Sequence, residues 1–355
     1  MIRVSLRDLQ WRRRRFVIVV FVAALAFGLA LVMTGVTNQL SQEGTNTVEL
    51  FDADQWVVAE GVSGPFTTSQ LIDRKLSDSI AADPGVDAAS PILIGRTLIG
   101  DRDVNVVGYD PASEMLPTKL VEALAGVSDP PAAQNGAIAD SRFAYGLGDR
   151  FVLGGTGLLV VAQVDDTSFY FSTPTVFLPI SVVQDLLFTG QDVASAVVVD
   201  GQVTGLDSAA GSVSMLGNDD VQADFERVIG STKDTIDIIN TLLWLMAAGI
   251  VAAIVYVSVL ERTRDFATLK AIGSSTRSLV VGLVAQAGVL SVCSAIAAVG
   301  VCRAISPTFS FPVSVPSSAY VQLLVVAMVV GVLASLAGVR KITHIDPALA
   351  FGGAS

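Results

Sequence analysis

Four long apolar runs constrain this chain more than any other feature of its sequence. They cover residues 16–38, 238–260, 278–303 and 320–339. A helix needs about 20 apolar residues to cross the hydrocarbon core of a bilayer, and each run is close to that length. Because 52% of all residues are hydrophobic and only 15% are charged, the composition argues against a small soluble enzyme. We therefore expect four transmembrane helices.

The charged residues predict how these helices are oriented. Residues 40–233 contain 9 Lys and Arg against 27 Asp and Glu, whereas the rest of the chain contains 13 basic and 6 acidic residues. Cytoplasmic loops of membrane proteins carry an excess of Lys and Arg. If both termini and the 261–277 loop are cytoplasmic, Arg303 is the one basic residue of those 13 on the outer side. We expect a multi-pass protein of the cell membrane, with residues 39–237 and 304–319 outside.

The first apolar run also has features of a secretory signal peptide. A basic stretch, residues 12–15, precedes it, and Ala24 and Ala26 resemble a cleavage site. Signal-peptide cores are about 7–15 residues long, which is shorter than this run. We therefore expect a retained transmembrane helix.

The acidic block between the first two apolar runs has the pattern of a folded domain. Strand-like stretches recur at residues 55–59, 104–107, 151–153, 158–162 and 196–199. Turn residues, such as the Gly pair at 154–155, separate them. We expect an α+β extracytoplasmic domain at residues 39–237, inserted between the first and second transmembrane helices of a membrane α-helical protein.

Helical stretches complete this domain. We expect short helices over residues 69–81 and 179–187, with Thr68 or Ser69 as the N-cap of the first. Residues 218–235 have little strand character. They are expected to form a helical stalk that continues into the second apolar run.

Motifs for intrinsic catalysis are missing from the sequence. It contains no G-x-x-x-x-G-K-[ST] P-loop, and its single histidine, His344, excludes a Ser-His-Asp triad. Cys293 and Cys302 lie in one apolar run, which suits neither a disulfide framework nor a zinc site. Paired carboxylates such as Asp165 and Asp166 fit a solvated surface. We expect no catalytic residues and, with a net charge of -11, no nucleic-acid partner.

The loop between the second and third apolar runs has an amphipathic helical pattern. Phe266, Leu269 and Ile272 recur every three residues, and Gly273 is a natural helix stop. A short helix with such a stripe either docks in a groove of a partner protein or lies on the inner membrane surface. The periodicity alone leaves both interpretations open.

Residues 261–275 resemble the coupling helix of FtsX-like and MacB-like ABC transporter permeases (type VII). The family pattern is E-R-x-R-E-x-x-x-L-[KR]-A-x-G-[AS]-[ST], from which this chain departs with Asp265 in place of Glu. Residues 344–350 resemble the family's D-P-x-x-A-L ending, in the cytoplasmic tail at 340–355. Residues 1–15 resemble its cytoplasmic amphipathic N-terminal helix. The plan of four helices with one large outer domain is also similar.

The resemblance implies a transport subunit and not an enzyme. Members of the family are permease homodimers that work with two copies of a separate ABC ATPase, which hydrolyses ATP. Motion of the ATPase passes through the membrane helices to the outer domains, a process called mechanotransmission. Membrane lipid is the other implied partner. The implied ATPase-coupling residues are Glu261, Arg262, Arg264, Phe266, Leu269 and Lys270.

The compact chain is most similar in layout to the haem-efflux permeases of single-membrane bacteria. Its opening W-R-[RK]-R-R and L-x-L-T/M-T-G stretches carry this resemblance. It implies extrusion of haem from the outer leaflet, at a site between the first and second helices of both protomers. The candidate haem-binding residues, all near outer helix ends, are Met33, Glu43, Glu49 and Tyr320.

Glu43 is the candidate ligand for haem iron, and no other metal site is expected. A carboxylate is a hard anionic donor that suits ferric iron. The alternative is that Glu43 is a solvated residue of the stalk.

Small residues on two apolar runs have different expected roles. On the fourth run, residues 331, 334, 335 and 338 are Gly, Ala, Ser and Gly, which favours close helix contact. On the first run, Gly28, Ala30 and Gly35 are expected to leave room for a planar ligand.

Three other functions are compatible with the same residues. The first is a permease-like scaffold that transmits ATPase motion to an outer cell-wall hydrolase. The second is an exporter of lipoprotein, peptide or drug. The third is a membrane-anchored sensor with no ATPase.

Overall fold

The computed structural model describes residues 13–67, 70–127, 136–205, 213–261, 268, 272, 275–309 and 312–343. The chain divides into two compact units. The membrane unit consists of Met1–Gln39 and Asp234–Ser355, and the sheet unit consists of Leu40–Lys233.

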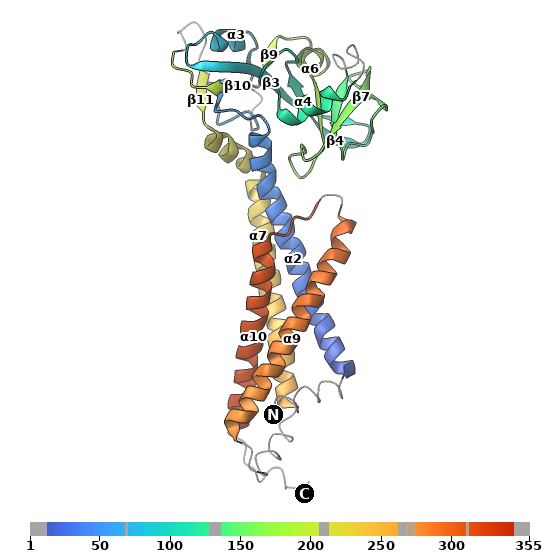
Figure 1. Cartoon of the computed structure of the whole chain (residues 1–355), viewed down its shortest axis with the longest axis vertical. Helices are drawn as coiled ribbons and strands as arrows, with labels where there is room; N and C mark the ends of the chain where they lie inside the picture. The colour runs from blue at the N-terminus through green and yellow to red at the C-terminus, as the bar shows by residue number, and fades with distance from the viewer. Residues whose placement is uncertain are drawn as a thin grey trace. The chain divides into compact units, whose positions relative to one another are not determined.

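Four long helices among the described residues carry the apolar runs. They are α2 (Arg13–Glu49), α7 (Asn218–Leu260), α9 (Thr276–Ile305) and α10 (Ser317–Thr343), coloured from blue to red in Figure 1. Each contains a stretch long and apolar enough to cross a membrane, which confirms the four expected membrane helices. The short 3-10 helix η2 (Ser306–Thr308) follows α9.

Helices α2 and α7 are longer than their apolar runs. The last residues of α2, from Leu40, and the first of α7, up to Lys233, belong to the sheet unit. The expected helical stalk over residues 218–235 is therefore confirmed as the beginning of α7. The expected N-terminal helix at residues 1–15 lies outside the described residues, apart from the first residues of α2.

Glycines bring the membrane helices into close contact. A Cβ at Gly338 on α10 would lie 2.6 Å from Val259 Cγ1 on α7, and a Cβ at Gly331 would lie 2.7 Å from Ser291 Oγ on α9. The expected small-residue face of the fourth run is therefore confirmed. Lipid provides no hydrophobic driving force between helices, so contacts of this closeness hold the bundle together.

The expectation that small residues on the first run leave room for a planar ligand is wrong for two of its three residues. A Cβ at Gly28 would lie 2.7 Å from Val301 Cγ1, and one at Gly35 would lie 2.5 Å from Val313 Cγ1. Ala30 has an exposed fraction of 0%. The space beside these glycines is filled because α2 packs against valine side chains of its own membrane unit.

Hydrogen bonds also connect the membrane helices. The indole Nε1 of Trp244 on α7 donates to Thr34 Oγ1 on α2 at 3.2 Å. The amide Nδ2 of Asn38 on α2 donates to the carbonyl of Ser314, in the segment that precedes α10, at 3.0 Å. An interhelical hydrogen bond such as that of Trp244 stabilises a membrane bundle by roughly 0.6–2 kcal/mol.

A mixed sheet forms the centre of the sheet unit. Among the described residues it has nine strands in the order β11-β1-β10-β3-β4-β8-β5-β7-β6. They are β1 (Gln55–Ala59), β3 (Val86–Ile99), β4 (Arg102–Tyr109), β5 (Ala137–Asp140), β6 (Arg150–Leu153), β7 (Thr156–Val164), β8 (Thr175–Pro179), β10 (Ala196–Gly201) and β11 (Val213–Leu216). Every strand-like stretch expected from the sequence lies within one of these strands.

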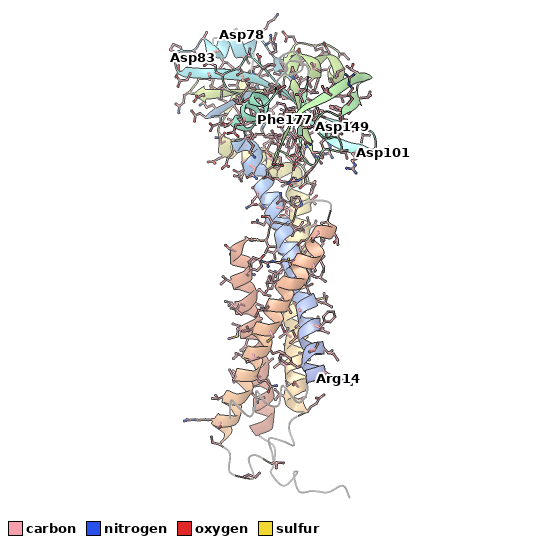
Figure 2. The ribbon with its side chains drawn as sticks, turned by 45° about the vertical axis from the view of Figure 1, so that its right-hand side comes forward. Arg14, Asp78, Asp83, Asp101, Asp149 and Phe177 are labelled. Atoms are coloured by element: carbon pink, nitrogen blue, oxygen red, sulfur yellow. The ribbon has the colours of Figure 1, made fainter. Side chains whose placement is uncertain are left out.

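Strand β3 connects the two parts of the sheet. Its first residues pair with β10 and its last seven, Leu93–Ile99, pair with β4, both antiparallel. The pairs β4·β8 and β5·β7 are parallel. Valine, isoleucine and leucine side chains from these strands fill the core, and Phe177 lies in the interior, whereas Asp101 and Asp149 lie at the surface (Figure 2).

Within the described part of the sheet unit, three short helices accompany the sheet: α3 (Leu76–Ala81), α4 (Thr118–Ala125) and α6 (Ile180–Leu187). Helix α6 confirms the helix expected over residues 179–187. The helix expected over residues 69–81 is shorter than predicted, because Ile72 and Asp73 form strand β2 and pair with β9 (Val193–Ala194). The carboxylate of Asp73 then accepts from Lys75 N at 2.9 Å, and the helix begins only after this turn. The proposed N-cap residues 68 and 69 lie outside the described residues.

We predict that Gly28→Ala lowers the thermal stability of the purified protein in detergent. The added methyl must displace Val301 or separate α2 from α9, and overpacking of this kind costs about 1–3 kcal/mol. Gly300→Ala on α9 is the matched control, because a Cβ there meets nothing within 4 Å. Equal melting temperatures for the two variants would contradict the packing described here.

Candidate functional site

The sheet unit contains the last residues of α2 and the first residues of α7. Two loops, at residues 66–67 and 169–173, are bonded to these helix ends. We call this region the helix-end junction. It lies wholly within Leu40–Lys233. Its residues are Glu43, Gly44, Phe66, Thr67, Tyr170, Ser172, Asp224 and Phe225.

Asp224 on α7 fastens the loop at residues 66–67 to that helix. Its side chain is fully buried. Oδ2 accepts from the backbone N–H of Phe66 at 3.1 Å and of Thr67 at 3.2 Å, and Oδ1 accepts from the Thr67 hydroxyl. A Cβ at Gly64 would lie 2.4 Å from Asp224 Oδ2, so the loop approaches this carboxylate closely only because residue 64 has no side chain.

Glu43 on α2 holds the other loop, at residues 169–173, through Ser172. Its exposed fraction is only 3%. Oε1 accepts from the Ser172 hydroxyl at 2.5 Å, and Oε2 accepts from the Ser172 backbone N–H at 3.2 Å. Both carboxylates of the junction thus hold loop backbone against a helix end.

The loop that Glu43 holds has an unusual backbone. Tyr170, Phe171 and Ser172 have φ angles of 56°, 62° and 57°, so three consecutive non-glycine residues lie in the left-handed region. This conformation costs roughly 1–2 kcal/mol per residue. The buried side chain of Asn105 on β4 donates from Nδ2 to the carbonyls of Phe169 and Thr173 at 3.0 and 3.1 Å, which closes the loop. The surrounding hydrogen bonds therefore stabilise a backbone that is unfavourable by itself.

Aromatic rings fill the space between the helix ends and the loops. Tyr170 stacks on Phe225 with centroids 5.2 Å apart and an interplanar angle of 2°, and Phe66 meets Phe225 edge-on at 5.5 Å. A Cβ at Gly44 would lie 2.9 Å from Phe225 Cδ1, so this glycine allows α2 to approach α7. The Tyr170 hydroxyl donates to the Phe66 carbonyl at 2.7 Å. Burial, and then the charge of Asp224, raise the pKa of this hydroxyl above its usual value.

The junction bonds both helix ends to loop backbone. The side chains of Glu43 and Asp224 are buried, and both accept from loop N–H groups. Among the described residues, no group of three or more His, Cys, Asp or Glu side chains is placed to hold a metal ion. The loop that Glu43 holds is bonded in turn to Asn105 on strand β4.

The four candidate haem-binding residues fall into both units. Glu43 and Glu49 are six positions apart on α2, and the structure places them on different faces, since Glu43 is buried and Glu49 is exposed. Met33 and Tyr320 belong to the membrane unit, where both are half-buried and Tyr320 packs against the apolar core. The structure does not bring Glu43 and Glu49 together.

Most of the expected coupling helix lies outside the described residues. This applies to Arg262, Arg264, Phe266, Leu269 and Lys270. Glu261 is exposed just after the end of α7. The backbone N–H of Ile272 donates to the Thr268 carbonyl at 3.1 Å, a helical spacing, and Ile272 is 78% exposed.

The sequence reasoning missed Tyr170, Ser172, Asp224 and Phe225. Two local signals for them exist. One is the aromatic run at residues 169–171 in an otherwise strand-rich block, and the other is an Asp-Phe pair in the stalk. The Asp165 and Asp166 pair is exposed, as expected, and Asp166 pairs with Arg142 at 3.2 Å.

Four membrane helices with a mixed-sheet domain inserted between the first two define the class of this protein, and the comparisons define the family. The chain is 36% identical over 357 residues to an uncharacterized ABC transporter permease of Mycobacterium tuberculosis, Rv2563, covering 99% of this chain and 100% of that protein. A second permease of that species, Rv0072, is 35% identical with the same coverage. Residues 238–347 match the family described as FtsX-like permease C-terminal. The chain belongs to the FtsX-like ABC transporter permeases.

Two more distant similarities were found. HrtB of Staphylococcus epidermidis, named as a hemin transport system permease protein, is 21% identical to this chain over 359 residues. The match covers 98% of each protein. The periplasmic region of MacB from Actinobacillus actinomycetemcomitans matches 48% of this chain and 92% of its own length, with 12% identity and a TM-score of 0.33.

We predict that Asp224→Ala destabilises the protein by about 2 kcal/mol or more, because it removes the acceptor of the buried Phe66 N–H and of the part-buried Thr67 N–H and hydroxyl. Thermal unfolding of the full-length protein in detergent measures this, with the fluorescence of Trp56, whose ring lies 6.3 Å from Phe66, as a local signal. Asp219→Ala is the control, since Asp219 is exposed on the first turn of the same helix. The proposed role of Asp224 fails if both variants unfold like the wild type.

Proposed function

We propose that this chain is the permease subunit of an ABC efflux transporter, in which two copies of a separate ATPase drive a permease homodimer through mechanotransmission. Both termini lie in the cytoplasm, and haem is extruded from the outer leaflet. The observation that carries the transport role is full-length identity of 36% to an ABC transporter permease. The haem substrate is supported by the resemblance to haem-efflux permeases and by the distant similarity to HrtB.

Helices α2 and α7 supply the mechanical part of this proposal. Each has an apolar stretch of membrane length and a second stretch in the sheet unit. In the sheet unit, Glu43 and Asp224 bond these helices to loop backbone. An ATPase that moves the cytoplasmic ends of the helices would therefore move the loops and the sheet.

The test of ATPase coupling is the double variant Phe266→Asp/Leu269→Asp. Charges at these positions would be buried without partners in the proposed ATPase groove, which costs several kcal/mol. We expect the complex to dissociate, or to lose ATP hydrolysis that depends on the permease, while the permease still inserts into the membrane. Copurification with the ATPase and the hydrolysis rate in nanodiscs measure this.

Thr268→Asp is the matched control for the coupling test. Thr268 is exposed and lies off the stripe formed by residues 266, 269 and 272. It adds a charge to the same segment without entering the proposed groove. Wild-type ATPase recruitment by the double variant would reject the docking of this stripe.

Haem binding is tested by titrating haem into the full-length protein and recording the Soret band. Glu43→Ala is expected to weaken binding and shift the band, because it removes the proposed oxygen ligand. Ser172→Ala removes a hydrogen-bond donor and leaves the carboxylate, so it is expected to retain the band. Glu60→Ala is the control, because Glu60 is an exposed carboxylate outside the four candidate haem-binding residues.

Each outcome of the haem experiment has one meaning. An unaltered spectrum for Glu43→Ala would remove Glu43 from the site. A wild-type complex whose ATP hydrolysis does not respond to haem would remove haem as the substrate, and the permease assignment would stand.

A further inference from the structure

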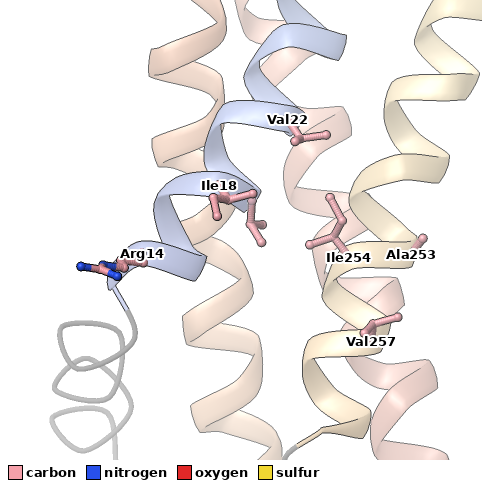
Figure 3. A pocket seen from close by; sticks show the side chains of 7 residues that line it. Arg14, Ile18, Val22, Ala253, Ile254 and Val257 are labelled. Atoms are coloured by element: carbon pink, nitrogen blue, oxygen red, sulfur yellow. The ribbon is translucent and has the colours of Figure 1, made fainter.

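The membrane unit contains a groove that the transport proposal does not use. It lies between the first turns of α2 and the last turns of α7 and has a volume of about 570 Å³ (Figure 3). Its lining residues are Arg14, Ile18, Val19, Val22, Ala253, Ile254 and Val257. All of them belong to the membrane unit.

The lining is apolar except at one end. Ile18 and Val22 on α2 face Ile254 on α7 across the groove (Figure 3). Ile18 is 62% exposed and Val257 is 45% exposed, so the groove opens sideways from the bundle. In a helix that crosses a membrane, the medium beside such side chains is lipid. The groove therefore accepts a hydrocarbon chain without desolvating any polar group.

Arg14 gives the groove a charged end. It lies on the first turn of α2 with an exposed side chain, at the level where the helix leaves its apolar run. Among the ion pairs of the described residues, none involves Arg14. A guanidinium binds phosphate oxygens by paired N–H donors and stays charged at any physiological pH. Arg14 lies at one end of an otherwise apolar groove (Figure 3), which is the same order of charge and hydrocarbon as in a phospholipid.

We propose that this groove binds an anionic phospholipid, with an acyl chain along Ile18, Val22 and Ile254 and the head-group phosphate at Arg14. Basic pockets between transmembrane helices on the cytoplasmic side recognise anionic lipids by this combination of contacts. Charge selects the lipid, because the apolar lining alone accepts the chains of any phospholipid. A lipid held between α2 and α7 would set the separation of the two helices that also enter the sheet unit.

The test uses full-length protein in nanodiscs made from equal amounts of phosphatidylglycerol and phosphatidylcholine, with retained lipids counted by native mass spectrometry. The wild type is expected to retain phosphatidylglycerol preferentially. Arg14→Gln should lower this retention about fivefold, the factor expected from one arginine beside an anionic head group. Arg277→Gln is the matched control, because Arg277 is also exposed on the first turn of a membrane helix but does not line the groove.

A second pair of variants tests the apolar part of the site. Ala253→Phe fills the groove and should lower phosphatidylglycerol retention, whereas Ala337→Phe, on an exposed position of α10, should not. Equal retention of the two lipids by the wild type, or full retention by Arg14→Gln, would overturn the proposal. So would efficient disulfide formation between protomers through Ile18→Cys in membranes, because a second copy of the chain would then occupy the groove.

Discussion

The absence of water from the hydrocarbon core is the constraint on which the membrane unit depends. Each backbone polar group there must be bonded within the protein, and a helix does this within its own segment. Helices in lipid gain little from hiding apolar side chains, so close contact has to hold them together. Gly28, Gly331 and Gly338 provide that contact, while large apolar side chains such as Leu245, at 64% exposed, remain on the outside of the bundle.

The sheet unit depends on a different constraint, because its sheet must be attached firmly to the ends of α2 and α7. A buried carboxylate is costly unless donors satisfy it, so it fixes whatever supplies those donors. At the helix-end junction the donors come from loops, and each loop is bound to a different helix: residues 66–67 to α7 through Asp224, and Ser172 to α2 through Glu43. The stacked rings of Tyr170 and Phe225 then connect the two sides.

The parts of this structure that follow from local pattern were predictable from the sequence, and the parts that follow from long-range contact were not. Apolar length alone predicts the four membrane helices, and strand-like stretches predict β1, β4, β6, β7 and β10. Strand β3 was missed because Pro91 and Gly95 interrupt its pattern, and only pairing with β10 and β4 makes it continuous. Gly28 was misjudged for a related reason, since the sequence cannot show that Val301 fills the space beside it. Ser172 and Asp224 gain their roles from residues more than a hundred positions away.

Glu43 shows how a binding residue and a structural residue can be the same side chain. Both of its oxygens accept hydrogen bonds from Ser172, and that residue ends a left-handed stretch that is unfavourable by itself. If Glu43 binds haem iron, as proposed, at least one of these hydrogen bonds must weaken. The loop would then lose part of what stabilises its backbone, and Asn105 would carry the change to strand β4. Substrate binding and movement of the sheet unit would be coupled through one carboxylate, because a ligand can shift a conformational equilibrium only by interacting differently with its two states.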